Sequence, residues 1–242
     1  MRRKLSRRAF VRSARSALRA RRDPRLAGKR RRTAALYALV LSRPLILRAL
    51  LHLRTVLVHK SYVFLYCAYA GIPFRGFMHD WSKFSPAEFC PSVQFYNGRS
   101  SPVGLCREIE GYSPGWLHHK GRNRHHHEYW QDVVDESGKV VMTPNTVVPI
   151  PMPFPYALEM ICDTIAASRA YNGSRFSYEL LMKWWNFYNS RPVNMHPKTK
   201  RFAQAMYEEL LRVGGRQALR RARELYDRAY AQEDAQATSP QS

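Results

Sequence analysis

Apolar residues recur at helical spacing along most of this 242-residue chain, and glycine or proline interrupts them at intervals. Within residues 55–70, for example, Val58, Tyr62 and Leu65 fall on one helical face. The stretch VVPIPMPFP at 147–155 carries too many prolines for a central strand. The pattern therefore predicts an all-α fold. Further helices are expected at 33–53, 85–96, 156–171, 176–189, 197–213 and 216–232, with a short piece at 105–109.

Two of these helices carry local signals of their boundaries. Pro44 should kink or split the run at 33–53. Ser85 followed by Glu88 has the S-x-x-E form of a capping box, and Pro86 suits the first helical position. A helix is therefore expected to begin at about Ser85.

Positive charge is concentrated at the N-terminal end. Residues 1–54 hold 18 of the 40 lysines and arginines but a single acid, Asp23, so they contribute +17 of the formal net charge of +22. Residues 1–32 are expected to form a basic, disordered arm or a loose helix. Three roles remain open for this arm: a solvated tail, a contact with nucleic acid or an anionic surface through counterion release, or an organelle transit peptide.

These features suggest four successive segments. We expect the basic arm at 1–32, an apolar helical segment at 33–54, a main domain at 55–213, and an amphipathic helix with a frayed tail at 214–242. The pair Gly214-Gly215 marks the start of the last segment.

The cysteines and the longest apolar runs indicate the cellular compartment in which the protein is expected. Four widely spaced cysteines contain no C-x-x-C pair and are expected to be buried free thiols in a reducing compartment. They are Cys67, Cys90, Cys106 and Cys162. No apolar run suffices for a transmembrane helix, and no secretory signal is expected at the N-terminus. The sequence thus favours the cytoplasm, or an organelle matrix if the arginine-rich start is a transit peptide.

The candidate metal-binding residues are centred on the stretch HDWSKFSP at 79–86. His79-Asp80 follows an apolar run, His59 lies upstream, and Asp163 lies in a later helical segment. Imidazoles and carboxylates are ligands that divalent Zn, Fe, Mn, Co and Ni prefer. A metal supplies hydroxide near neutral pH by lowering the pKa of a bound water. We therefore expect residues from several helices to converge on one metal site with one or two ions. The alternative is a coincidence of surface histidines.

The stretch WLHHKGRNRHHHEYW at 116–130 holds five of the nine histidines. Because adjacent helical residues point about 100° apart, one histidine of a pair often binds a metal while its neighbour does something else. His127 is the weakest candidate and is expected to be solvated. His52 and His196 are expected to be structural. The tryptophans at 81, 116, 130, 184 and 185 are expected in the core.

The order His59, His79-Asp80, Asp163 resembles that of the HD-domain superfamily of metal-dependent phosphohydrolases. HDWSK resembles the HD-x-x-K of that superfamily, and ICDTIAASRAY resembles the helix with its last metal-binding aspartate. His118-His119 is similar to the paired histidines of the subgroup that degrades cyclic dinucleotides, although the GYP signature of that subgroup is absent. The resemblance implies an HD-domain-like helical bundle.

A closer resemblance, over roughly residues 55–212, is to a family of small bacterial and phage proteins of unknown function. Arg124 and His127 depart from its pattern. The motifs shared with that family are HKSYV at 59–63, GIP at 71–73, HDWSKFSPAEF, WLHHKGRNRHHHEYW, MP at 152–153, EMICD, AYNG, WW at 184–185 and HPKT at 196–199.

Carried over residue by residue, the superfamily pattern implies that His59, His79, Asp80 and Asp163 hold a first metal. A second ion would be held by histidines of the 116–130 stretch. The candidates are His118, His119 and His126, or His125.

The remaining roles concern catalysis and substrate. Asp80 would orient the nucleophilic water, and Lys83 would contact a phosphate, although a lone lysine is more often simply solvated. Arg122, Arg99 and Asn123 are lesser substrate contacts, and Asn123 is alternatively a turn former. Glu128 and His125 are expected to form hydrogen bonds with the ligand histidines. Glu128 is alternatively a ligand itself, or a cap or ion-pair partner of Arg122 or Arg124.

Together these residues favour a metal-dependent phosphohydrolase acting on a nucleotide or another phosphorylated small molecule. The alternative is a nucleic-acid-associated binding module in which the metal is structural and the arginine-rich arm carries the binding function. A metal enzyme of different chemistry, such as an oxygen-dependent iron enzyme, is a third possibility.

Overall fold

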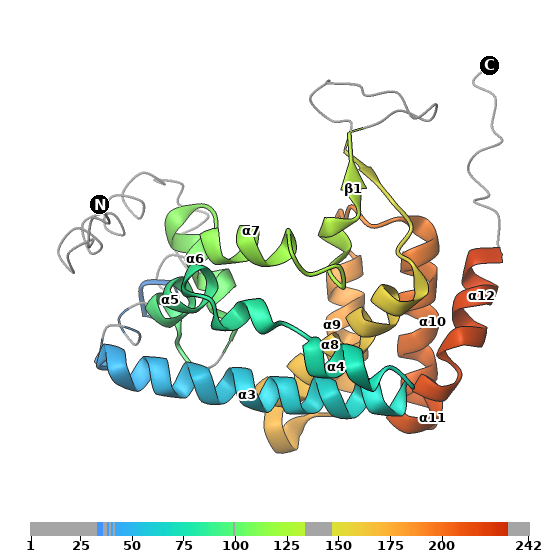
Figure 1. Ribbon diagram of the computed structural model, residues 1–242, viewed down its shortest axis with the longest axis horizontal. Helices are drawn as coiled ribbons and strands as arrows, with labels where there is room; N and C mark the ends of the chain where they lie inside the picture. The colour runs from blue at the N-terminus through green and yellow to red at the C-terminus, as the bar shows by residue number, and fades with distance from the viewer. Residues whose placement is uncertain are drawn as a thin grey trace. The chain divides into compact units, whose positions relative to one another are not determined.

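The computed structural model describes residues 33–35, 38, 40, 42–98, 100–133 and 147–231. The predicted basic arm at 1–32, Arg99 and the predicted tail after Ala231 lie outside the described residues. The described chain is predominantly helical and contains one pair of two-residue strands, which confirms the all-α prediction (Figure 1). Within these ranges no helix is long and apolar enough to span a membrane.

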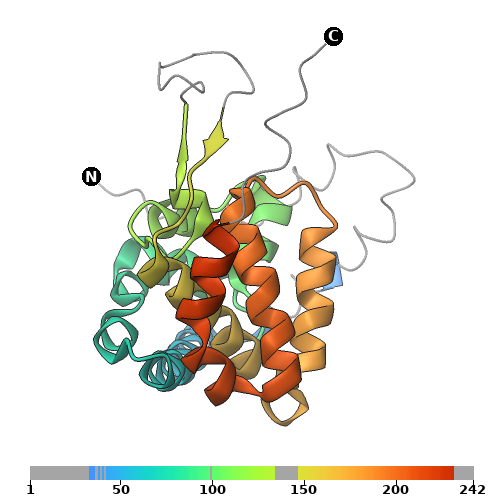
Figure 2. The same ribbon diagram turned by 90° about the vertical axis from the view of Figure 1, so that its right-hand side faces the viewer.

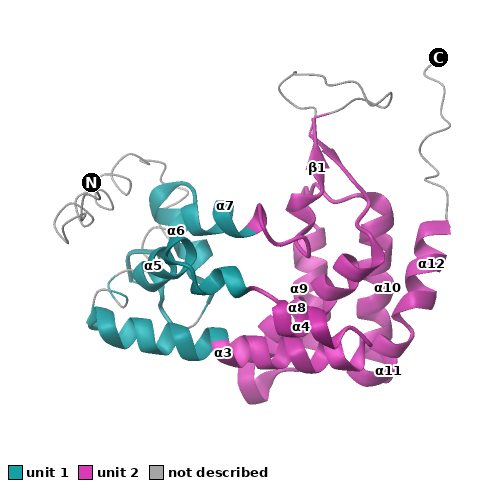
Figure 3. Cartoon of the chain, viewed as in Figure 1, with its two compact units in different colours: residues 1–56, 81–119 teal, residues 57–80, 120–242 magenta. Residues whose placement is uncertain are grey.

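The chain divides into two compact units (Figure 3). Unit 1 comprises residues 1–56 and 81–119, and unit 2 comprises residues 57–80 and 120–242. Helix α3 (Leu45–Tyr69) contributes its first part to unit 1 and its second part to unit 2.

In unit 1, α3 is followed by the 3₁₀ helix η2 (Trp81–Phe84) and by α5 (Pro86–Phe95), α6 (Pro102–Glu110) and α7 (Pro114–Lys120). Phe95, Leu105 and Ile109 belong to its small apolar core. Arg48 of α3 donates from Nη1 to the carbonyl oxygens of Val93 (3.2 Å) and Gln94 (2.8 Å). These bonds satisfy carbonyls at the C-terminal end of α5, which have no partner inside that helix.

Unit 2 is built around α8 (Phe154–Asn172), most of whose apolar residues are buried. The second part of α3, α4 (Pro73–Met78) and the 3₁₀ helices η3 (His127–Tyr129) and η4 (Gly173–Arg175) belong to this unit. So do strands β1 (Gln131–Asp132) and β2 (Val148–Pro149), which pair antiparallel. The last helices of the unit are α9 (Tyr178–Asn189), α10 (Pro197–Val213), α11 (Gly215–Arg220) and α12 (Ala222–Ala231).

Helix α10 lies between α9 and α12 and also contacts α8 and α11 (Figure 2). Phe202, Met206 and Leu210 of α10 are fully buried in the unit 2 core. They lie at i, i+4 and i+8, so one apolar stripe of α10 faces the core.

Two predicted boundaries were wrong. The helices expected at 33–53 and 55–70 are not separate beyond Pro44, because α3 runs unbroken from Leu45 to Tyr69. No glycine or proline stands between those residues, so nothing interrupts the backbone hydrogen bonds. The helix expected at 216–232 is instead two helices, α11 and α12, which meet at Arg221.

The cysteine prediction holds for three of the four residues. Cys67, Cys106 and Cys162 are free and buried, whereas Cys90 is free and exposed. Cys90 lies on the solvent face of the short helix α5, where apolar sequence neighbours do not guarantee burial.

Helix α4 packs against α3 at Gly76. A Cβ atom added at Gly76 would lie 2.7 Å from Cys67 Cβ and 2.9 Å from Phe64 Cα, so only glycine fits there. Because Phe64 Cα belongs to the backbone of α3, neither helix could relieve the contact by rotating a side chain.

We expect Gly76→Ala to lower the free energy of unfolding by about 1–3 kcal/mol, because overpacking forces the helices apart. Gly104→Ala is the matched control: it lies in α6 with no atom within 4 Å of an added Cβ. That change is expected to raise the stability by up to about 1 kcal/mol. Urea unfolding of both variants measures the difference, and equal effects would contradict the close packing of α4.

Candidate metal centre

The turn after α4 holds His79 and Asp80 in an unusual backbone conformation. His79 ends the helix with φ −56° and ψ 130°, and Asp80 has φ 54°. Asp80 is the only non-glycine residue with a positive φ among those the structure describes. Such a conformation costs about 1–3 kcal/mol, although aspartate adopts it more readily than most residues. Both side chains are buried, which places an ionisable pair inside unit 2 at the end of a helix.

Two further helices and one loop of unit 2 face this turn. Helix α3 contributes His59, which is buried. Helix α8 contributes Glu159 and Asp163, which are four residues apart and therefore share one face. The loop before η3 contributes His125, which is buried as well.

The side chains of His59, His79, Asp80 and Asp163 converge. Nε2 of His59 lies 3.0 Å from Asp163 Oδ1, and Nε2 of His79 lies 3.1 Å from Asp80 Oδ2 and 3.4 Å from Asp163 Oδ1. One ligand atom from each of the four lies within 4.8 Å of the others. These residues come from three separate segments of the chain, so the folding of unit 2 assembles the cluster.

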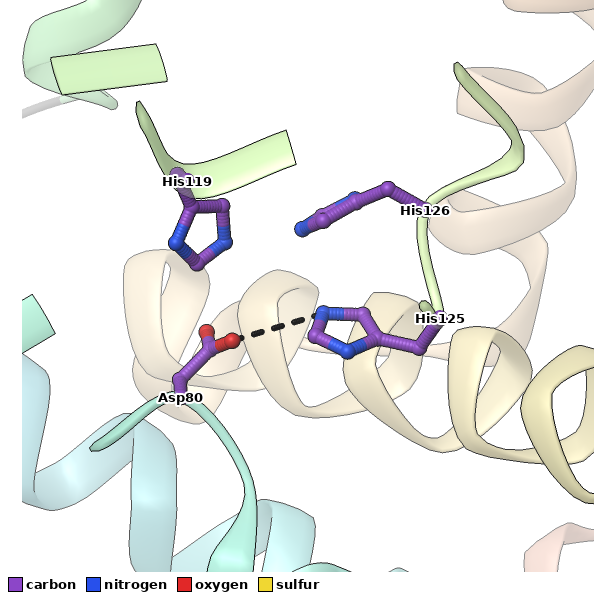
Figure 4. Close-up of side chains that lie close together, drawn as sticks. All are labelled: Asp80, His119, His125 and His126. Atoms are coloured by element: carbon purple, nitrogen blue, oxygen red, sulfur yellow. Dashed lines mark ion pairs between the residues drawn. The ribbon is translucent and has the colours of Figure 1, made fainter. Parts of the chain in front are cut away.

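His125 joins the same cluster. Its Nε2 lies 3.4 Å from Asp80 Oδ1 and 3.8 Å from Asp163 Oδ2; Figure 4 marks the contact with Asp80. Its ring contacts those of His79 and His126, whose centroids are 4.3 Å and 4.2 Å away. The sequence predicted a supporting role for His125, whereas the geometry directs its Nε2 toward the two aspartates.

Glu159 lies on the other side of the two rings. Its Oε1 is 3.0 Å from His79 Nδ1 and 3.4 Å from His125 Nδ1. Its Oε2 accepts from Arg75 Nε (2.9 Å) and lies 2.8 Å from Arg75 Nη2. Glu159 was not among the residues that the sequence predicted for the site. Its position four residues before Asp163, within EMICD, was the available signal, because that spacing places both carboxylates on one helix face.

The main chain of the turn is also held in place. Lys60 of α3 donates from Nζ to the carbonyl oxygens of His79 and of Phe77, the latter at 3.3 Å. The residue next to His59 therefore fixes the backbone that carries His79-Asp80.

The pKa values of these residues reflect their mutual contacts. Burial lowers the pKa of His79, but the Asp80 carboxylate and hydrogen bonds to acidic neighbours raise it well above its usual value. Burial raises the pKa of Asp163, but His59 and His79 hold it well below its usual range. For Glu159 the histidines outweigh burial and lower the pKa to about 2. Contacts with histidines thus favour the charged form of both Asp163 and Glu159.

This donor set fits a divalent transition metal. Ligand atoms about 2.0–2.2 Å from such an ion lie about 3.0–3.4 Å from one another, and most of the separations above fall in that range. Nε2 of His79 is buried, and its polar neighbours are the carboxylate oxygens of Asp80 and Asp163. Imidazole nitrogen together with carboxylate oxygen is the chemistry expected for Zn, Fe, Mn, Co or Ni.

His118 and His119 are found in unit 1, on α7. Their Nδ1 atoms each lie 2.7 Å from an oxygen of Glu88, which is buried on α5. Burial raises the pKa of Glu88, but the two histidines lower it below its usual value. Ser85 is the N-cap of α5, yet its side chain makes no capping hydrogen bond, so the predicted capping box is wrong in that respect. A second ion on His118, His119 and His126 stays a prediction.

Lys83 is half-buried in η2 of unit 1. Burial, and then the charge of Lys83, lowers the pKa of His52 to about 4. His52 packs against Phe89 and Tyr96, in agreement with its predicted structural role. The proposed contact between Lys83 and phosphate stays a prediction.

The other candidates lie in the loop that follows α7. Arg122 is exposed, and the carbonyl of Asn123 accepts from His126 N–H (3.2 Å), which places Asn123 in a turn. Glu128 is partly buried and lies 3.5 Å from His127 Nε2. Their predicted parts in substrate binding and ligand support stay predictions.

Three predictions about structural side chains have clear outcomes. His127 is buried and its Nε2 lies 2.6 Å from Tyr188 Oη, so the expectation that it is solvated was wrong. His196 accepts from Lys198 N–H at the start of α10, which confirms its structural role. Trp185 is in the core as predicted, whereas Trp81 and Trp184 are exposed.

Unit 2 therefore contains a buried cluster of His, Asp and Glu side chains that could hold a metal ion. The model of a family of unknown function, DUF5662, matches residues 48–209, and the chain belongs to this family. The matched range includes His59, His79, Asp80, His125, Glu159 and Asp163. No curated protein matches the chain, and no solved structure does.

Proposed function

We propose that this protein is a metal-dependent phosphohydrolase that acts on a nucleotide or another phosphorylated small molecule. The observation that carries the proposal is the convergence of His59, His79, Asp80 and Asp163 within unit 2. Their order along the chain resembles that of the HD-domain superfamily, and their ligand atoms lie close enough together to share one ion.

His59, His79, Asp80 and Asp163 would hold the metal, with His125 as the nearest further donor. A divalent metal bound there supplies Lewis acidity and makes hydroxide available near neutral pH. Phosphoryl transfer requires chiefly a positioned nucleophile and stabilisation of negative charge, and a buried, polar metal site can provide both.

Asp80 is the proposed catalytic residue. Oδ2 faces His79 and Oδ1 faces His125, so the carboxylate lies beside the two histidine nitrogens that face the same site. The positive φ fixes the main chain beneath it. A carboxylate held in this way can orient an attacking water and accept its proton. Lys83, three residues later in the HD-x-x-K motif, is the proposed phosphate contact.

We expect Asp80→Asn to lower the turnover of phosphate esters by about 100- to 10,000-fold, the usual contribution of a positioned proton acceptor. Asparagine tolerates the positive φ and matches aspartate in size, so the fold should persist. The assay is phosphate release from a panel of nucleotides and phosphorylated small molecules with Mn²⁺ added. Asp132→Asn on exposed β1 is the control.

Full activity in Asp80→Asn would refute the hydrolase proposal. If deletion of residues 1–32 abolished function while Asp80→Asn did not, the nucleic-acid-binding alternative would be favoured instead.

A further inference from the structure

We infer that Glu159 is a positioning residue that keeps the Nδ1 proton on both His79 and His125, so that both Nε2 atoms are directed to the metal, and that Arg75 holds Glu159 in this place. The inference rests on the metal site of the proposed function, but not on any particular reaction.

The two oxygens of the Glu159 carboxylate have different partners. Oε1 faces Nδ1 of His79 (3.0 Å) and of His125 (3.4 Å), whereas Oε2 faces Nε (2.9 Å) and Nη2 (2.8 Å) of Arg75. One oxygen thus serves two imidazoles and the other serves one guanidinium. Glu159 is buried, so these contacts replace water around a charged group.

The contact with Glu159 determines which nitrogen of each histidine ring carries the proton. A carboxylate accepts hydrogen bonds and does not donate them, so the nitrogen facing Glu159 must carry the proton. A metal binds the neutral form of imidazole, which has one N–H and a lone pair on its other nitrogen. Nε2 of both His79 and His125 faces Asp80 and Asp163. Glu159 therefore selects the tautomer in which both lone pairs are directed to the aspartates.

Without this carboxylate, that tautomer of the neutral rings would lose the Nδ1 acceptor that favours it. Asp80 and Asp163 also accept hydrogen bonds, and a proton on Nε2 would satisfy them in the absence of a metal. That proton would occupy the nitrogen that a metal requires. Glu159 removes the competition by offering an acceptor at the other end of each ring.

Arg75 holds the Glu159 carboxylate in position. Arg75 lies in α4 and His79 directly follows the last residue of that helix, whereas Glu159 and Asp163 are four residues apart on α8. The two helices therefore meet through matched pairs, Arg75 with Glu159 and His79 with Asp163. Arg75 also stacks over the ring of Tyr156, 4.2 Å from its centroid, which limits the positions of its guanidinium. Its positive charge offsets the charge of Glu159, which would otherwise be costly to bury.

The test uses Zn²⁺ as the probe and the full-length protein. We expect Glu159→Gln to weaken Zn²⁺ binding by about 10- to 100-fold, as is usual when the partner of a metal-binding histidine is removed. Competition with a chromophoric chelator measures the affinity. Glu209→Gln on α10 is the matched control, because Glu209 is equally buried but contacts Arg212 and Arg221 and no histidine. The control should bind Zn²⁺ as tightly as the wild type.

The second readout is the ¹⁵N spectrum of the histidine side chains in the Zn²⁺-loaded protein, which reports which nitrogen carries the proton. We expect Nδ1–H and metal-bound Nε2 for His79 and His125 in the wild type, and loss of this uniform pattern in Glu159→Gln. The spectrum of the wild type alone is decisive if the variant does not fold. Metal on Nδ1 of either ring would overturn the inference.

Arg75→Gln is the second variant, because Arg75 is partly exposed and its loss leaves the histidines in place. It should weaken Zn²⁺ binding in the same direction as Glu159→Gln and by a smaller factor. Wild-type affinity in both variants would overturn the positioning role while leaving the metal site intact. Failure of the wild type to bind Zn²⁺ would instead refute the metal site, and the proposed function with it.

Discussion

Replacing His59 with asparagine is expected to weaken the binding of a divalent metal by more than about 100-fold, which exceeds the usual effect of losing a group that only supports a ligand. Nε2 of His59 lies 3.0 Å from Asp163 Oδ1, and asparagine is too short to place a donor there. The loss should appear in a competition titration with a chromophoric chelator, using Mn²⁺, Zn²⁺ and Co²⁺ in turn.

Helix α3 itself offers the control for this prediction. His52 lies seven residues before His59 on the same helix, and both residues are 7% exposed. His52 packs against Phe89 and Tyr96 and contributes nothing to the cluster in unit 2. His52→Asn should therefore lower stability but leave metal affinity unchanged. Equal weakening in both variants would mean that the integrity of α3, and not ligation by His59, sets the affinity.

Removal of the metal is expected to destabilise the wild-type protein by about 3–4 kcal/mol when free metal is in several-hundred-fold excess over its dissociation constant. A metal that binds the folded cluster but not the unfolded chain shifts the folding equilibrium by this amount. Urea unfolding of metal-loaded protein, with and without excess chelator, measures the difference.

Asp163→Asn should abolish this difference, because it removes the carboxylate that faces His59, His79 and His125. Its stability should be lower than that of the loaded wild type and insensitive to the chelator. A chelator effect that persisted undiminished in Asp163→Asn would place the stabilising ion elsewhere in the chain.

Helix boundaries were predictable where the chain carries its own stop signals. Pro197 is the first residue of α10 and Gly214 follows its last, and the predicted range 197–213 is the observed one. A break between two helices was expected near residue 54, but the chain has no glycine or proline there and the helix continues. The capping box at Ser85 failed for a different reason: Glu88 has the right spacing, but its carboxylate faces His118 and His119, about thirty residues later. Long-range contacts of this kind override a local pattern.

The sequence also indicates part of the candidate metal site. The His-Asp pair, an upstream histidine and a later aspartate can be recognised from residue type and order. The spacing of Glu159 and Asp163 places both on one helix face, and His125 stands in a histidine-rich stretch. The contacts that define their roles, however, depend on how α4, α8 and the loop before η3 pack together. The burial of His127 likewise depends on Tyr188, 61 residues further along the chain. Residue type suggests which groups can bind a metal, whereas tertiary packing decides which nitrogen of each histidine faces the carboxylates.

The most direct test of the metal centre is the metal content of the purified protein, measured by mass spectrometry on the wild type and on a His79→Ala/Asp80→Ala double variant. The account predicts about one to two equivalents of a transition metal in the wild type, lost in the double variant. A wild type that contains no metal, even after reconstitution with Mn²⁺, Fe²⁺, Zn²⁺, Co²⁺ and Ni²⁺, would contradict it and leave the histidines as part of the scaffold.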